Sequence, residues 1–173
     1  MKYLRKYILL ATCVVLFIGM SSATCVRGLD CGGLSHGYYK NHESAWVGYD
    51  PGDKIIDVFP SAQPFVSNTD TLRMALRYKG GNGVDGAERI LLRQAVAAIL
   101  NNADPGIPYY YGYWGTEGPG DDITLPYIIP PDFTREKNEA NIKAIVNTVI
   151  SRQDRDEMLF WASVFDHYNN IGV

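Results

Sequence analysis

The stretch after Val84 constrains the fold most, because a helix formed by it would be apolar on nearly every side. Asp85 is a candidate amino-terminal cap, and Asn101-Asn102 followed by Pro105 predicts the end of the element. A helix without a polar face must be enclosed by other elements. We therefore expect residues 86–101 to form the central helix, with apolar positions Ile90, Leu91, Leu92, Ala95, Val96, Ala97, Ala98, Ile99 and Leu100.

Four further segments carry helical patterns: a short one from Asn41 to Trp46, one over 72–78 after a polar cluster at 67–70, one after Thr134, and one after Asp154. Residues 151–153 alone separate the last two, which predicts an antiparallel helical hairpin. Residues 55–59 fit a strand or a helical turn equally well. We expect a mainly α fold, a small helical bundle around the central apolar helix with long irregular surface segments.

The amino terminus has the order of a secretory signal peptide. Lys2, Arg5 and Lys6 precede an apolar run over 8–19, and small residues lead to a cleavage position after Ala23. An uncleaved membrane anchor is the alternative, but it needs about 20 apolar residues. We expect residues 1–23 to be removed and residues 24–173 to form a single extracellular domain that is not bound to the membrane.

Cleavage would leave two cysteines, Cys25 and Cys31. A secreted protein meets an oxidising environment, so we expect these two residues to form a disulfide that closes a short loop. A zinc site is the alternative, and it would need four ligands.

Charge disfavours some classes of partner. The whole chain has 16 basic and 19 acidic residues, a net charge of −3. Removal of residues 1–23, which contain three basic and no acidic residues, leaves 13 against 19, a net charge of −6. The remaining cations are scattered among acids, so nucleic acid and anionic lipid are not expected partners.

Residues 104–133 are rich in Gly, Pro and aromatic residues, and segments of this length are usually functional. Their aromatics suit core packing first, and contact with other copies or with sugar rings second. Paired carboxylates beside them suggest glycoside hydrolysis as a third interpretation, and calcium binding as a weak one. The candidate contact residues are Tyr109, Tyr110, Tyr111, Tyr113, Trp114, Glu117, Asp121 and Asp122.

The three histidines, His36, His42 and His167, are weak candidates for a metal site, because three imidazoles can hold zinc. The favoured interpretation is structural: Asn41 caps a helix, and His42 packs against Trp46 four residues later. A second acidic group, Asp50, Asp53 and Asp57, is expected to be a solvated surface.

Residues 35–46 read SHGYYKNHESAW. This stretch resembles the signature CTPGYWKNHxxAW of a secreted domain found in bacterial and archaeal surface proteins, and further matches extend the similarity over most of residues 31–171. The resemblance implies an extracellular surface module and supplies no catalytic residues. The signature residues are Gly37, Tyr38, Tyr39, Lys40, Asn41, His42 and Trp46.

These observations predict a secreted or cell-surface structural or interaction protein, without enzymatic activity or cofactor, that assembles with itself or with other surface proteins. The alternative is a protein that binds or hydrolyses polysaccharide through residues 109–122.

Overall fold

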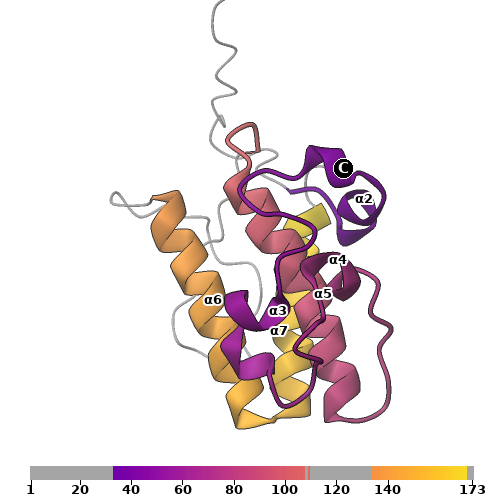
Figure 1. Cartoon of the computed structure of the whole chain (residues 1–173). Coiled ribbons are helices and arrows are strands. Elements are labelled where there is room, and N and C mark those ends of the chain that lie inside the picture. Colours follow the sequence, from indigo (N-terminus) through magenta and orange to yellow (C-terminus); the bar gives the residue numbers. More distant parts are fainter. Residues whose placement is uncertain (1–32, 108, 110–133, 171–173) are drawn as a thin grey trace, which may run out of the picture.

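The computed structural model describes residues 33–107, 109 and 134–170. This part of the chain is mainly helical and contains no strand. The long helix α5, Val84–Ala103, runs through the middle of the bundle (Figure 1). Helices α6, Arg135–Arg152, and α7, Arg155–Asn170, pack against it, and shorter helices cover the remaining side. The predicted mainly α bundle around a central apolar helix is confirmed.

The termini of α6 and α7 are fixed by local hydrogen bonds. Thr134 Oγ1 accepts from the backbone N–H of Lys137 at 3.2 Å. Asp154 Oδ1 accepts from the backbone N–H of Asp156 and of Glu157, at 2.9 and 3.0 Å. Between the two helices Gln153 adopts a left-handed conformation with φ 56°, which ends α6 and reverses the chain.

The direction of each helix follows from contacts at one end of the bundle. The carboxyl-terminal end of α5 meets the amino-terminal end of α6, where Asn102 bonds to Asn138, and the carboxyl-terminal end of α7, where Asn101 bonds to Asn169. α6 is therefore antiparallel to α5, and α7 is parallel to it. The expected α6–α7 hairpin follows from the same contacts.

The hydrophobic core lies between α5 and its neighbours. Almost all of the second half of α5 is buried, and it meets buried side chains of α6 and α7. Burying one such aliphatic or aromatic side chain contributes roughly 1.5–3 kcal/mol. These partners on α6 and α7 include Ile142, Val146, Ile150, Met158 and Phe165.

The amino-terminal half wraps around α5 as short elements. They are α2 His36–Asn41, the 3₁₀ turn Glu43–Ala45, α3 Ile55–Val58, the 3₁₀ turn Pro60–Ala62 and α4 Leu72–Ala75. Residues 55–58 are thus a helical turn, the second of the two forms that fit the sequence. The cap of α4 is Thr71, whose hydroxyl accepts from the N–H of Met74.

A close backbone approach joins this half to α5. The Gly80-Gly81 turn lies directly on the first turns of α5, and a Cβ placed on Gly86 would overlap the backbone of Gly81. A glycine inside a helix costs roughly 1 kcal/mol relative to alanine. Glycine at position 86 nevertheless lets the Gly81 backbone approach α5 more closely than any side chain would permit.

Candidate functional site

Four buried asparagines form a polar network at the end of the bundle where α5 and α7 finish and α6 begins. Asn101 and Asn102 lie on α5, Asn138 on α6 and Asn169 on α7, and each is at most 2% exposed. The sequence predicted that Asn101-Asn102 would end the helix. α5 ends at Ala103, between this pair and Pro105, so both asparagines lie inside its last turn.

Asn101 uses its full hydrogen-bonding capacity. Its Oδ1 accepts from the N–H of Leu34 at 2.6 Å and from the hydroxyl of Tyr39 at 3.0 Å. Its Nδ2 donates to the carbonyl of Leu34 at 2.9 Å and to Asn169 Oδ1 at 3.0 Å. With two donors and two acceptor bonds satisfied, Asn101 fixes residues 34–39 to α5 and to α7.

Asn169 extends the network to the start of the aromatic segment, residues 104–133. Its Oδ1 also accepts from the hydroxyl of Tyr109 at 3.1 Å, and its Nδ2 donates to the carbonyl of Gln94 at 3.0 Å. Tyr109 is 1% exposed. This residue therefore packs in the core and is not an exposed contact residue in this structure.

A second pair of asparagines holds the other end of the segment. Asn102 Oδ1 accepts from Asn138 Nδ2 at 2.8 Å, and Asn102 Nδ2 donates to the carbonyl of Arg135 at 3.0 Å. The Arg135 guanidinium donates to the carbonyls of Asn102 and Ile107, at 2.6 and 2.9 Å. The same few buried groups thus join Ile107 and Tyr109, near the start of the segment, to Arg135, just after its end.

The remaining candidate contact residues of this segment lie outside the described residues. They are Tyr110, Tyr111, Tyr113, Trp114, Glu117, Asp121 and Asp122. The predicted signal peptide at 1–23 and the cysteines of the predicted disulfide, Cys25 and Cys31, lie outside them as well.

The residues of the signature form α2 and the turn after it. Ser35 caps α2, its Oγ accepting from the N–H of Tyr38 at 3.2 Å, and Asn41 is the last residue of the helix. The expected capping role of Asn41 is therefore wrong. His42 does not pair with Trp46: its ring stacks on Tyr38, with centroids 4.3 Å apart. Trp46 Nε1 donates to the carbonyl of Tyr39 at 3.1 Å.

Gly37 and Lys40 complete the signature on α2. The Gly37 carbonyl accepts from Asn41 Nδ2 at 3.0 Å, and Lys40 is half-buried in the last turn. Tyr39 is the buried residue of the helix, and burial raises the pKa of its phenol. The signature thus packs one tyrosine into the asparagine network and stacks the other on a histidine.

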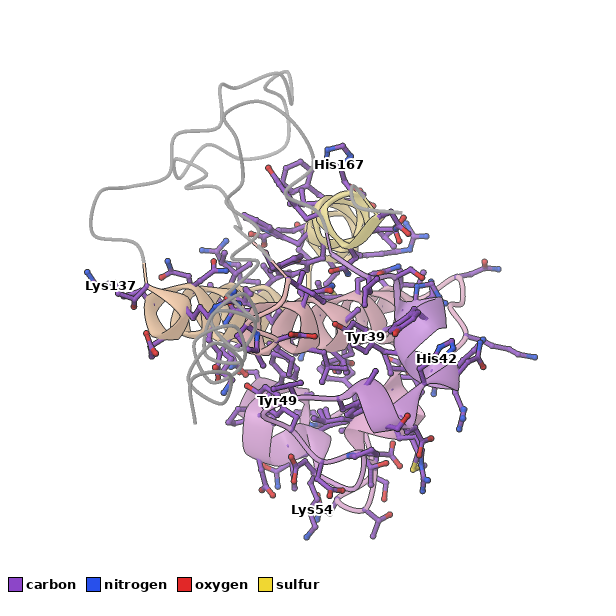
Figure 2. The ribbon with its side chains drawn as sticks, turned by 90° about the horizontal axis from the view of Figure 1, so that it is seen from above. Tyr39, His42, Tyr49, Lys54, Lys137 and His167 are labelled. Atoms are coloured by element: carbon purple, nitrogen blue, oxygen red, sulfur yellow. The ribbon has the colours of Figure 1, made fainter. Side chains whose placement is uncertain are left out.

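The three histidines do not converge. Figure 2 shows His42 beside α2 and His167 on α7, at different sides of the molecule. His36 lies against Gln94, with Nδ1 3.4 Å from Nε2 of the amide, and burial together with the Arg93 charge lowers the pKa of its imidazole. Among residues 33–107, 109 and 134–170, no three His, Cys, Asp or Glu side chains are grouped closely enough to hold a metal.

The acidic group at 50–57 shapes a turn. Asp53 Oδ2 accepts from the N–H of Asp50 at 2.8 Å, and Asp50 Oδ1 accepts from the N–H of Gly52 at 2.7 Å. Asp57 is exposed on α3. These carboxylates satisfy backbone donors of their own loop, as Asp commonly does in turns.

Sequence reasoning missed Glu88. It is 1% exposed, and neither of its carboxyl oxygens has a hydrogen-bond partner. Burial and the nearby Asp85 charge raise its pKa to about 8. Helical spacing could have found it, because position 88 falls on the same face of the apolar helix as Leu91, Leu92 and Ala95.

None of the helices in the described part of the chain is both long enough and apolar enough to span a membrane. Comparisons of the chain with models of protein families, with curated proteins and with solved structures gave no match.

Proposed function

We propose that this protein is a secreted or cell-surface subunit without enzymatic activity, and that it acts by contact with other copies or other surface proteins. The contact is made by the aromatic and acidic segment at 110–133. The helical bundle serves as the rigid support from which that segment is presented.

One observation carries the proposal: a buried polar network ties both ends of the segment to three helices. Tyr109 bonds to α7 through Asn169, and Arg135 bonds to α5 through Asn102. Buried amides of this kind are costly when left unpaired, so a network that satisfies them specifies one arrangement of the chain. Binding residues are often carried on loops whose ends a rigid scaffold positions.

The sequence adds three supporting features. The order of basic, apolar and small residues over 1–23 is that of a secretory signal, and residues 35–46 resemble a signature found in bacterial and archaeal surface proteins. Tyrosine and tryptophan are also the residue types that contribute most to the centres of protein interfaces.

Replacement of aromatic residues in the segment tests the proposal. We expect the triple variant Tyr111→Ser, Tyr113→Ser and Trp114→Ser to lose concentration-dependent association in size-exclusion chromatography while keeping the far-UV circular dichroism of the bundle. The matched control is Val47→Ser, which removes an exposed large hydrophobic side chain outside the segment. This control should associate like the unmodified protein.

Equal association of the triple variant and the control would contradict the proposed contact. A glycan array and a hydrolysis screen with the same proteins test the alternative function, since a hit that the triple variant loses would assign the segment to polysaccharide.

Amino-terminal sequencing of material from the medium tests cleavage after Ala23.

A further inference from the structure

Six basic side chains gather on one face of the amino-terminal half, although they are scattered among acids in the sequence. They come from α2, α4, the turn after α4 and the first half of α5. We call this the basic face, and it comprises Lys40, Arg73, Arg77, Lys79, Arg89 and Arg93.

Contacts connect α2 and α4 within this face. Arg77 Nη2 donates to the carbonyl of Lys40 at 3.3 Å. Arg73 and Arg77 both approach the carboxylate of Glu43, at 3.4 and 3.7 Å. Their side chains are nevertheless 48% and 51% exposed, so both guanidinium groups remain open to a partner.

Further contacts connect α4 to α5. Arg93 Nη1 donates to the carbonyl of Tyr78 at 3.1 Å, next to Lys79. The charge of Arg93 acts on His36 together with that of Lys40, and the charge of Arg89 acts on Tyr78. The basic face is therefore continuous from α2 to the first half of α5.

The acids within this region leave it positive. Glu43 pairs with Arg73 and Arg77, while Asp70 accepts a hydrogen bond from the Tyr78 hydroxyl at 2.6 Å. Asp85 acts on Glu88 and Asp166 acts on His36, so the six basic side chains stand against four acids. Glu88 adds no charge at neutral pH, because burial raises its pKa to about 8. A positive face on a chain of net negative charge attracts an acidic partner.

The same chain contains a segment with matching chemistry. Residues 104–134 include five acids and no Lys, Arg or His. Tyrosines and a tryptophan precede four of these acids, and an arginine can bond to a carboxylate and stack on an aromatic ring at the same time. The acids are Asp104, Glu117, Asp121, Asp122 and Asp132.

The carboxyl-terminal end of the segment lies away from the basic face. Figure 2 shows Lys137, in the first turn of α6, and His42, beside α2, at opposite sides of the molecule. We propose that the basic face binds the acidic aromatic segment of a second copy of the chain, which gives head-to-tail assembly. This inference rests on the proposed function and names the surface that the segment contacts. Head-to-tail contacts between different surfaces build rings or filaments.

Charge reversal with complementation tests the inference by sedimentation velocity at about 20 mM and about 300 mM salt. Arg73→Glu with Arg77→Glu reverses part of the basic face, and Asp121→Lys with Asp122→Lys reverses part of the segment. We expect each double variant alone to associate at least 10-fold more weakly than the unmodified protein. An equimolar mixture of the two should associate again, because each retains the surface that the other has lost.

The matched control is Lys54→Glu with Lys137→Glu, which makes the same change in net charge outside the basic face. It should associate like the unmodified protein. Arg73→Gln with Arg77→Gln provides a milder pair if the reversal unfolds the protein, and partial loss of association is then expected. High salt should weaken association of the unmodified protein.

The outcomes distinguish the two proposals. A strictly monomeric unmodified protein would overturn both the proposed assembly and this inference. Binding of the segment to the basic face of the same chain would overturn both as well, because no contact between copies would then form. Association that persists in the Arg73/Arg77 variants would overturn this inference alone. Tighter binding of a DNA or heparin probe than of a second copy would also overturn it, since the face would then serve a different polyanion.

Discussion

Replacement of Glu88 by Gln should make the protein more stable at alkaline pH. Glu88 is 1% exposed, and neither carboxyl oxygen has a hydrogen-bond partner. Burial is the largest cause of its raised pKa of about 8, the charge of Asp85 adds to it, and the charge of Arg89 opposes it. Gln has nearly the same shape and carries no charge at any pH.

The magnitude follows from the difference between the folded and unfolded chains. In the folded protein the carboxyl keeps its proton up to about pH 8, whereas in the unfolded chain it ionises near its ordinary pKa of 4.5. The unfolded chain therefore releases the proton first, and the stability present at low pH is lost as the pH rises from 4.5 to 8. At about 1.4 kcal/mol per pH unit the upper bound is roughly 5 kcal/mol. Local relaxation reduces such penalties, so we expect about 2–4 kcal/mol.

Urea unfolding followed by circular dichroism at several values between pH 4.5 and pH 9 measures this effect. The free energy of unfolding of Glu88→Gln should lie within about 1 kcal/mol of that of the unmodified protein at pH 4.5, because both side chains are then neutral. At pH 8.5 the free energy of unfolding of Glu88→Gln should exceed that of the unmodified protein by about 2–4 kcal/mol. Asp156→Asn is the control, because the Asp156 side chain is 90% exposed. We expect its free energy of unfolding to differ from that of the unmodified protein by the same amount at every pH. A constant difference for Glu88→Gln would refute the reasoning.

Three further predictions follow from the fold. Asn101→Ala leaves several buried polar groups unpaired and should reduce the free energy of unfolding by at least about 2 kcal/mol in urea titrations, and a loss below 1 kcal/mol would contradict the network. Gly86→Ala should lower the melting temperature because its Cβ would overlap the backbone of Gly81, whereas Gly83→Ala, with open space around the new Cβ, should lower it less, by the loss of a glycine N-cap alone; a more stable Gly86→Ala would exclude that contact. Nuclear magnetic resonance titration should place the His36 midpoint below 6.5, because burial lowers its pKa, so stability should fall as the pH drops below 6.5; a midpoint at or above 6.5 would contradict its burial.

The long helices could be predicted because local signals and long-range packing agree in them. The apolar run of α5 requires enclosure, and the Thr134 and Asp154 caps act within a few residues of their own position. The hairpin of α6 and α7 follows from the short connection between them. Each of these features depends on side chains close together in the sequence.

The candidate site could not be predicted, because its decisive contacts join distant residues. Asn usually favours helix ends, where it bonds to nearby backbone. Asn101 lies inside α5 because its partners are at Leu34 and Asn169, 67 and 68 residues away. Near α2 the predicted cap is Asn41, whereas Ser35 forms the cap in the structure. The basic face likewise assembles only when α2 and α4 dock on α5.

The molar mass of the protein as a function of concentration tests the central claim most directly, namely that the bundle presents residues 110–133 for contact between copies. Multi-angle light scattering at low salt measures it. The account predicts a mass that rises with concentration through multiples of the single chain and falls back when salt is added. A mass that stays at that of one chain over the whole concentration range would contradict it.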